Sequence, residues 1–394
     1  MYSRRHNFYK CQAMVIKFGG NVNDRCGNLT KKTKLKSANS SPGDNSGNFL
    51  IKMDHSKNLA ERSSRLLCEE LRSNTSVNFK AQYLASQGRA TLFSARFFHF
   101  MQTHIQPAKR YINTMIHPLI AVCQMRSIAD KVKNLQVVSE LAAEAKRRSA
   151  TIAFFPEACD FLANNKKDIV TMAEPLTGVI VTSYKEIAIK NNIWLSLGGI
   201  HEASDNMEKI YNTHILINNE GELVAVYRKL HLFDMDNKDT GVRLMESDYV
   251  LKGIEIVPPV LTPVGKLALS ICYDIRFPEL SIILRNMGAQ ILTYPSAFTY
   301  ETGAAHWEVM LRARAIENQC YVIAAAQTGT HNKKRMSWGH AMIVDPWGTI
   351  IAQCADKMGI AMAEIDLALL EKIRKNMPCE QHRRNDLYSR MECQ

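Results

Sequence analysis

The sequence of 394 residues lacks the patterns that mark secreted, membrane and zinc-stabilised proteins. Its ten cysteines form no C-x-x-C pair and no regular spacing, so we expect neither a disulfide framework nor a structural metal site. No apolar run reaches about 18 residues, the length that could span a bilayer, and no secretory h-region appears at the N-terminus. We therefore expect a soluble protein of a reducing compartment, either the cytoplasm or the mitochondrion.

The motifs of several catalytic classes are also missing. The chain has no G-x-S-x-G, no H-E-x-x-H, no P-loop and no dinucleotide-binding fingerprint. These absences argue against elbow-type serine hydrolases, zinc metalloproteases, P-loop nucleotide hydrolases and nicotinamide dehydrogenases. A Cys-His-Asn enzyme stays open, because twelve histidines are present, although none stands in a distinctive setting.

Acidic residues are absent from positions 71–129, and the charge of the chain is unevenly divided. Residues 1–115 carry 19 Lys and Arg against 6 Asp and Glu, whereas residues 116–394 carry 31 against 32. The extension 1–115 is basic, polar and poor in acids, which predicts a largely disordered segment or a targeting leader. No aromatic-basic platform is evident and the rest of the chain is near neutral, so we expect no nucleic-acid or membrane partner.

From position 116 apolar runs alternate with helical periodicity, which predicts one α/β domain over residues 116–385 and a tail, 386–394. Strands are expected at 117–125, 150–157, 193–200, 266–274, 291–297 and 321–328, and hairpins at 212–230 and 341–354. Helices are expected over 127–148, 178–190 and 304–319, and from Pro278 onward. In the first of these helices, Val132 and Val138 belong to the apolar stripe.

Three polar residues end apolar runs of this domain. Glu157 closes ATIAFFPE, Lys229 closes LVAVYRK and Cys272 closes LALSIC, and the carboxyl ends of strands are where α/β sheets place their sites. Alone, each residue has an ordinary interpretation: a hydrated carboxylate, an exposed lysine, and a small buried thiol. Together they supply acyl transfer, because a thiol nucleophile needs a base and its tetrahedral adduct needs a cation for the oxyanion.

The sequence that follows Cys272 predicts how the thiol would be activated. Pro278 suits the first turn of a helix, so Cys272 lies shortly before a helix N-terminus. The helix dipole and Lys229 would both favour the thiolate. Asp274 and Arg276 flank this turn, and they predict either a structural ion pair or a contact with substrate.

Three segments, FFPEACDF, YRKLHLFD and ICYDIRFPEL, resemble in this order the signature segments of the nitrilase superfamily, and its Nit-type branch in particular. The resemblance covers about residues 117–390 and includes YPSAF, GHAMIVDPWG and QHRRNDLY. It implies an α/β fold, a four-layer α-β-β-α sandwich, and an enzyme that hydrolyses carbon-nitrogen bonds of linear amides. It also implies that no metal or organic cofactor is needed and that the protein forms a homodimer or a higher homo-oligomer.

Carried over position by position, the resemblance assigns four catalytic positions. It makes Cys272 the nucleophile that forms a thioester and Glu157 the general base. Lys229 would stabilise the oxyanion, together with a backbone N–H at the turn. Glu246, in LMESDY, matches a second glutamate that is hydrogen-bonded to the other three.

On the substrate side, the resemblance places Arg276 against a carboxylate, with Phe298 and Thr302 lining the same pocket. The expected partner is a small-molecule amide that carries a carboxylate. The branch implies deaminated glutathione, the α-keto analogue of glutathione, cleaved to 2-oxoglutarate and Cys-Gly. A short ω-amide such as α-ketoglutaramate is the alternative within the class, and a catalytically idle interaction scaffold is the alternative of another class.

Overall fold

The structure, a computed structural model, describes residues 117–238, 242–333 and 335–388 of the chain. The prediction of a disordered or targeting leader over residues 1–115 therefore lies outside the described residues, and so does most of the predicted tail. Within the described residues, no helix is long and apolar enough to cross a bilayer.

The strand β1 (Leu119–Met125) shows how the layers arise from the sequence. Successive side chains of a strand point to opposite faces. Ile120 and Val122 belong to one buried cluster, whereas Ala121 and Cys123 belong to another. Because both faces are apolar, β1 must be covered on both sides, which places it between two layers.

A nine-stranded sheet is built around β1 among the described residues. β1, β2 and β3 are parallel neighbours, and β4 and β5 extend the sheet as an antiparallel hairpin. The path runs β14-β13-β1-β2-β3-β4-β5, with β17 paired to β1 and β8 to β4. Beside β1 its strands are β2 (Ile152–Phe155), β3 (Trp194–Ala203), β4 (Ile210–Ile217), β5 (Leu223–Arg228), β8 (Val250–Leu251), β13 (Ala326–Asn332), β14 (Arg335–Trp338) and β17 (Gly359–Glu364).

A six-stranded sheet packs against the first, in the order β16-β15-β12-β11-β10-β9. Side chains from both sheets share one core cluster, which holds Ile120 of β1 together with Leu267 and Val322. The strands are β9 (Val260–Thr262), β10 (Gly265–Ala268), β11 (Ile291–Thr293), β12 (Tyr321–Ala324), β15 (Met342–Val344) and β16 (Ile350–Gln353). A separate two-stranded ribbon joins β6 (Asp234–Asn237) to β7 (Val242–Met245).

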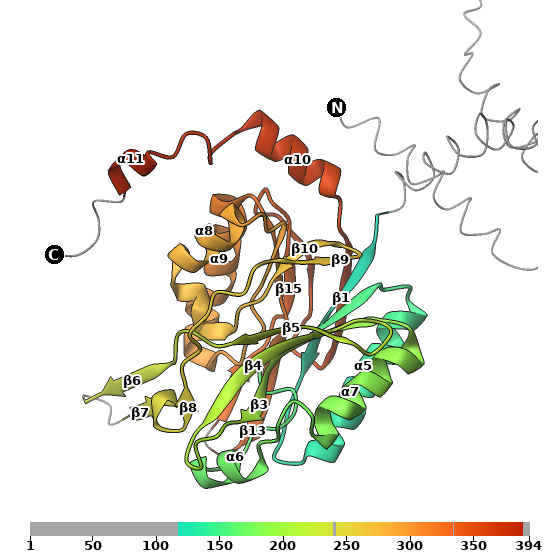
Figure 1. Ribbon diagram of the computed structural model, residues 1–394, viewed down its shortest axis with the longest axis vertical. Coiled ribbons are helices and arrows are strands. Elements are labelled where there is room, and N and C mark those ends of the chain that lie inside the picture. Colours follow the sequence, from blue (N-terminus) through green and yellow to red (C-terminus); the bar gives the residue numbers. More distant parts are fainter. Residues whose placement is uncertain (1–116, 239–241, 334, 389–394) are drawn as a thin grey trace, which may run out of the picture. The chain divides into compact units, whose positions relative to one another are not determined.

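Helices cover the outer face of each sheet, which gives four layers (Figure 1). On the nine-stranded sheet, α5 contacts β1 and β2, and α7 contacts β3 and β4; on the six-stranded sheet, α9 contacts β12 and β15 and packs on α8. The predicted α-β-β-α sandwich is therefore confirmed. The α-helices are α5 (Lys131–Arg147), α6 (Lys166–Met172), α7 (Val179–Asn191), α8 (Pro278–Asn286), α9 (Tyr300–Asn318), α10 (Leu367–Asn376) and α11 (Asn385–Tyr388).

Several strand predictions were too long; the run 291–297, for example, forms a strand only as far as Thr293. The run 321–328 is two strands, because the chain passes from the six-stranded sheet (β12) to the nine-stranded sheet (β13) at Ala325. The run 266–274 forms a strand only as far as Ala268, and Cys272 opens a 3-10 turn, η3 (Cys272–Arg276). In α5, Val138 is buried as expected, but Val132 is 76% exposed.

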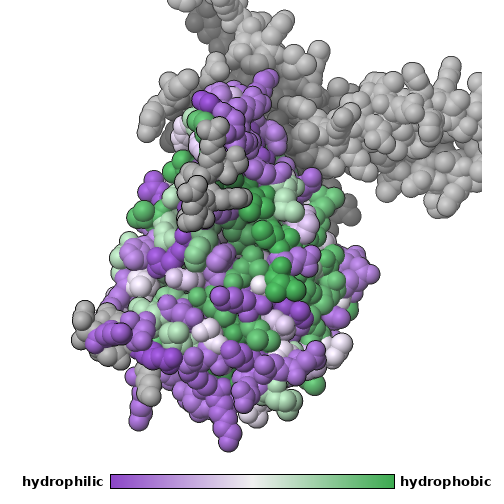
Figure 2. Space-filling view, turned by 60° about the vertical axis from the view of Figure 1, so that its left-hand side comes forward, coloured by the Kyte–Doolittle hydropathy of each residue, from purple (hydrophilic) through white to green (hydrophobic). Residues whose placement is uncertain are grey.

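Apolar side chains also remain on the surface of the outer helices of the six-stranded sheet. On α8 and directly after it these are Ile283 and Met287, and on α9 they are Val309 and Ile316, each at least 41% exposed. These helices lie on the side that Figure 2 turns toward the viewer, where apolar residues are gathered. Trp307 of the same helix α9 is buried, so α9 presents apolar side chains both to the core and to solvent.

Candidate active site

Glu157 lies in the turn that follows β2, and the backbone around it is tightly held. The next residue, Ala158, is left-handed (φ 58°), and its N–H donates to the Gly199 carbonyl at 2.8 Å. The Gln327 amide donates to the carbonyls of Glu157 at 2.9 Å and of Ala158 at 3.2 Å. The Glu157 carboxylate is thereby turned inward and is 6% exposed.

Lys229 directly follows β5 and forms hydrogen bonds with two carboxylates. Its ammonium donates to Glu157 Oε1 at 2.9 Å and to both oxygens of Glu246, at 3.0 and 2.9 Å. Glu246 opens the 3-10 turn η2 (Glu246–Asp248), and the Phe233 N–H donates to its Oε2 at 2.7 Å. Two carboxylates and one ammonium leave this buried cluster with one net negative charge.

Asn212, which the sequence analysis did not predict, joins the two carboxylates. It lies inside β4, and its Nδ2 donates to Glu157 Oε1 at 2.9 Å and to Glu246 Oε1 at 3.1 Å. Asn212 Oδ1 is buried and has no hydrogen-bond partner among the described residues. A polar residue inside the buried run IYNTHILI is the signal that could have pointed to it, since its desolvation needs a reason.

Cys272 reaches the same cluster from the other sheet. Its backbone is left-handed (φ 45°), a conformation that a non-glycine residue keeps only where its surroundings hold it. Its N–H donates to the Pro295 carbonyl at 3.0 Å, and its thiol lies near enough to Glu157 and Lys229 for the charges of both to act on it. The Ala297 N–H donates to Glu157 Oε2 at 3.0 Å. The site thus lies where the ends of the two sheets meet.

Opposing effects set the charge states of Glu157 and Lys229. Burial raises the pKa of Glu157, but the Lys229 ammonium outweighs burial and brings the pKa from 4.5 down to about 2. Burial lowers the pKa of Lys229, but the carboxylates of Glu157 and Glu246 hold it well above its ordinary value. At neutral pH the base is therefore ionised and the cation is charged.

The thiol shows the opposite of the expected shift. Burial raises the pKa of the Cys272 thiol, and the Glu157 carboxylate raises it further, while Lys229 lowers it. Lys229 therefore acts in the predicted direction, but burial and Glu157 outweigh it, and the thiol stays protonated. Pro278 does open α8, as predicted, but η3 separates that helix from Cys272. The remaining negative charge of the cluster also disfavours a second anion.

Asp274 connects the turn that carries the cysteine to the end of β5. It is fully buried, and its Oδ2 accepts from the Ile271 N–H at 2.8 Å and from the Tyr227 hydroxyl at 2.6 Å. Its Oδ1 accepts from the His231 N–H at 3.1 Å and lies 2.8 Å from the same residue's Nδ1. The predicted ion pair between Asp274 and Arg276 is wrong, because the Asp274 oxygens are used by these groups.

Arg276 lies beside two aromatic rings. Its guanidinium is 5.8 Å from the ring centroid of Tyr273 and 5.7 Å from that of Phe298. It also lies 3.3 Å from His306 Nδ1. Among the described residues, no carboxylate forms an ion pair with Arg276, so its charge is available to a ligand.

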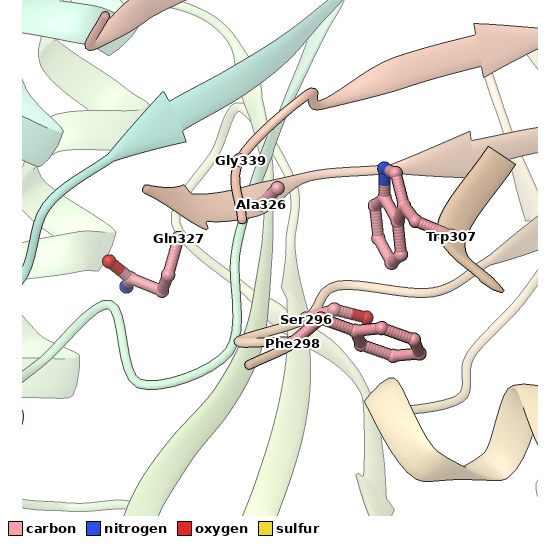
Figure 3. Close-up of a pocket in the computed structure, with 6 residues that line it drawn as sticks. All are labelled: Ser296, Phe298, Trp307, Ala326, Gln327 and Gly339. Carbon is pink, nitrogen blue, oxygen red and sulfur yellow. The ribbon is translucent and has the colours of Figure 1, made fainter. Parts of the chain in front are cut away.

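Phe298 lies between β11 and α9, and Thr302 lies in the first turn of α9. Phe298 packs on Trp307, 5.0 Å between ring centroids, and Figure 3 shows both rings beside a small gap from which Gln327 points away. The gap is too small to admit a water molecule, so it is not a substrate pocket. Thr302 Oγ1 lies 2.7 Å from Thr299 Oγ1. The contacts of Phe298 and Thr302 with substrate stay predictions.

The cluster has the parts needed for attack of sulfur on a carbonyl carbon. A thiol, an ionised carboxylate near it and an ammonium fixed by that carboxylate lie together where the two sheets meet. Over the part of the chain that the structure describes, no group of three or more His, Cys, Asp or Glu is placed to hold a metal ion. Chemistry without a cofactor stays a prediction.

Comparison with known proteins identifies the family. Residues 119–375 match the carbon-nitrogen hydrolase family. The chain belongs to this family. A nitrilase and fragile histidine triad fusion protein of Drosophila melanogaster is 54% identical to this carbon-nitrogen hydrolase over 271 residues, which are 68% of the chain. The chain spans only 58% of the length of that fusion protein.

The chain covers most of the length of two further relatives of this carbon-nitrogen hydrolase. Deaminated glutathione amidase of Rattus norvegicus is 52% identical over 274 residues, 69% of the chain and 84% of the relative. The crystal structure of Saccharomyces cerevisiae Nit3, a member of branch 10 of the nitrilase superfamily, is 30% identical with a TM-score of 0.61. That match covers 68% of the chain and 96% of Nit3. The resemblance to the nitrilase superfamily is therefore confirmed.

Proposed function

We propose that this carbon-nitrogen hydrolase is an amidase that cleaves deaminated glutathione to 2-oxoglutarate and Cys-Gly. The observation that carries the proposal is that Cys272 lies beside the buried pair of Glu157 and Lys229, whose charges both act on its thiol. The 52% identity to a deaminated glutathione amidase supports the choice of substrate. Arg276 supports it as well, since a guanidinium suits the carboxylate of a 2-oxo acid.

The first half of the reaction starts from the protonated thiol. Cys272 Sγ attacks the amide carbon while its proton passes to Glu157, because a free thiolate is unfavourable beforehand. The resulting oxyanion meets the Lys229 ammonium and the N–H of Tyr273, which lies in the first turn of η3, where N–H groups have no partner in the helix. Glu157 then protonates the departing nitrogen, and the C–N bond breaks. Cys-Gly departs, and the acyl group of the 2-oxo acid stays on Cys272 as a thioester.

The second half of the reaction returns the enzyme to its starting state. Glu157 takes a proton from water, whose oxygen attacks the thioester carbon, and the C–S bond breaks. The thiolate that leaves recovers the proton from Glu157, and 2-oxoglutarate is released. Glu246 acts as a positioning residue, because it holds the Lys229 ammonium from the side opposite Glu157. These steps consume one amide and one water.

The test of the substrate compares two amides on the purified full chain. We expect kcat/KM for deaminated glutathione to exceed that for α-ketoglutaramate, which shares the 2-oxo acid but releases only ammonia. A ratio that favours α-ketoglutaramate tenfold or more, about 1.4 kcal/mol in transition-state binding, refutes the proposed substrate.

The test of the nucleophile compares two cysteine variants. Cys272→Ser removes the thiol that forms the thioester, so we expect hydrolysis to be lost and no acyl-enzyme to be detected by mass spectrometry. Cys379→Ser is the matched control, because Cys379 is a partly exposed free cysteine outside the cluster. Full hydrolysis by Cys272→Ser would overturn the assignment. A wild-type chain that cleaves no amide would favour the idle scaffold instead.

We propose a homodimer that uses the outer face of the six-stranded sheet's helices. Val309 on α9 is 69% exposed and apolar, although it lies on a helix whose other face fills the core. Val309→Lys is expected to shift sedimentation toward the monomer. Ile189→Lys on α7, an apolar residue that is 55% exposed over the other sheet, is the control that leaves the dimer intact. Equal sedimentation of the two variants would contradict this interface.

We propose the cytoplasm as the location of the protein, with the mitochondrion as the alternative. The basic, acid-poor composition of residues 71–129 supports the alternative, because it is typical of presequences. A fusion of residues 1–116 to a reporter decides between them: diffuse fluorescence supports the cytoplasm, and mitochondrial fluorescence refutes it.

A further inference from the structure

Gln327 is a buried residue of β13 whose side chain binds the turn that carries Glu157. Its Nε2 donates to the Glu157 carbonyl at 2.9 Å and to the Ala158 carbonyl at 3.2 Å. The residue is 1% exposed, and Figure 3 shows its side chain pointing away from the gap beside Phe298 and Trp307. One amide therefore holds two successive carbonyls of a turn in which Ala158 is left-handed.

Ser127, which is fully buried, decides how the Gln327 amide is oriented. Its backbone N–H can only donate, and it donates to Gln327 Oε1 at 2.9 Å. The Nε2 of Gln327 therefore faces the carbonyls of the turn, and it also donates to Ser127 Oγ at 2.7 Å. The Ser127 carbonyl accepts from His331 Nδ1, on the same strand as Gln327, at 2.8 Å. The amide is held at its oxygen and at its nitrogen, so the donor that the turn receives has a fixed position.

The backbone of Gln327 binds a second segment that reaches Glu157. Its N–H donates to the Ser296 carbonyl at 2.9 Å. The residue after Ser296 is Ala297, whose N–H donates to Glu157 Oε2 at 3.0 Å. The carbonyl of the residue before Ser296 accepts from the Cys272 N–H at 3.0 Å. Gln327 thus contacts both the turn that carries the base and the segment that binds its carboxylate, and this segment also holds the nucleophile.

The reaction needs this precision because Glu157 transfers a proton in every step. It takes one from sulfur, gives it to the departing nitrogen and takes another from water, and each transfer requires hydrogen-bond distance. Lys229 and Asn212 hold Oε1 of the carboxylate, but rotatable bonds lie between that carboxylate and the backbone. A displacement of the turn by about 1 Å would move the carboxylate out of line, and such an error can lower the rate about a hundredfold.

We propose that Gln327 is a positioning residue for the general base: its amide holds the turn that carries Glu157, and its N–H holds the segment that binds the Glu157 carboxylate. The inference rests on the proposed function, because Glu157 is the base of that reaction. Gln327 touches neither the substrate nor the reacting atoms. Its loss is therefore expected to lower kcat much more than it raises KM.

The experiment makes the donor at this position depend on pH. Gln327→Glu keeps the shape of the side chain, and a protonated carboxyl can still donate to one carbonyl, whereas a carboxylate has nothing to donate. Burial against carbonyl oxygens raises the pKa of this new carboxyl, so the donor is present at low pH and is lost as pH rises. We expect the ratio of variant to wild-type kcat to fall about tenfold or more between about pH 5.5 and pH 8, while KM changes less than about threefold.

Two further variants complete this experiment. Gln319→Glu is the matched control, because Gln319 is a buried glutamine whose Nε2 donates to the Met377 carbonyl at 2.7 Å, where the ends of α9 and α10 meet. Its kcat ratio to the wild type should not change with pH. Gln327→Met loses the donor at every pH, so it should lower kcat about tenfold to a hundredfold at both pH values. A kcat ratio of Gln327→Glu that stays constant, or a fall that Gln319→Glu shares, would overturn the inference.

A measurement without an amide substrate separates this inference from the proposed function. The rate at which iodoacetamide alkylates Cys272, followed at that residue by mass spectrometry, depends on the carboxylate beside the thiol. At about pH 8, Gln327→Glu should change this rate about threefold or more, but less than about twofold when Glu157→Gln has already removed the carboxylate. Equal changes in both backgrounds would refute the role of Gln327. A wild-type chain that cleaves no amide would refute the proposed function, and the alkylation rates would still decide on Gln327.

Discussion

Replacing Asn212 by aspartate tests how two carboxylates stay ionised side by side in the buried cluster. The Asn212 amide donates to both Glu157 and Glu246. Aspartate has the same shape but adds a third carboxylate where the cluster has one ammonium, on Lys229. Three buried carboxylates cannot all stay ionised beside a single cation, so one of them takes up a proton nearer to neutral pH.

The magnitude follows from the contacts. A hydrogen bond to a charged group contributes about 1.5–3 kcal/mol, so losing both donations removes about 3–6 kcal/mol. Asn212 Oδ1 is a buried acceptor without a partner in the described part of the chain. Removing it is expected to raise the free energy of unfolding by about 1–3 kcal/mol. We therefore expect Asn212→Leu to lower the free energy of unfolding by about 2–3 kcal/mol, with little dependence on pH.

Asn212→Asp should instead show a loss that depends on pH. The pKa of the new carboxyl is raised in the folded state above its unfolded value. Its protonated form can donate to Glu157 or Glu246, so stability is highest below the unfolded pKa and is lost as pH rises through the folded pKa. Urea unfolding of both variants at about pH 5 and pH 8 separates the two patterns.

The same pair of variants has an expected kinetic signature. The wild-type kcat/KM should show no acid limb above about pH 4 from Glu157, whose pKa is about 2. In Asn212→Asp a limb should appear about one to three pH units higher than in the wild type, whereas Asn212→Leu should lower kcat/KM without a new limb. A profile of Asn212→Asp that superimposes on the wild type would refute the reasoning.

Three further predictions use the geometry around the cluster. Gly199→Ala should lower stability by about 1–3 kcal/mol in thermal unfolding, because Gly199 has φ 77° and a new Cβ would lie 2.6 Å from Asn212 Oδ1; an unchanged melting temperature would contradict this. Tyr227→Phe removes the 2.6 Å hydrogen bond to Asp274 and should lower the free energy of unfolding by about 1.5–3 kcal/mol. An unchanged free energy of unfolding would show that this bond does not stabilise the fold. The lowered pKa of Glu157 contributes stability that is present above its unfolded value of 4.5 and is lost as pH falls toward about 2, so urea midpoints between pH 5 and 3 should fall more in the wild type than in Glu157→Gln.

The sequence was informative where a polar residue ended a long apolar run. Glu157 and Lys229 were predicted as site residues for this reason, and the structure brings them within 2.9 Å of each other. Asn212 was missed because Thr213 and His214 follow it directly in β4, so the sequence does not single it out. The predicted strand 321–328 was too long because its apolar residues continue through Ala326, and only the pairing partners assign its two halves to different sheets.

The sequence by itself determined the α/β class, most element positions and the three residue types of the triad, because hydrophobic periodicity and strand ends are local properties. The tertiary structure alone decided how these residues act on one another. Burial and the net negative charge of the cluster keep the Cys272 thiol protonated, against the local expectation from a following helix. It also showed that Arg276 lies beside the rings of Tyr273 and Phe298 and forms no ion pair with a carboxylate of the described residues. Charge and burial depend on every neighbour in space, so no local pattern could predict them.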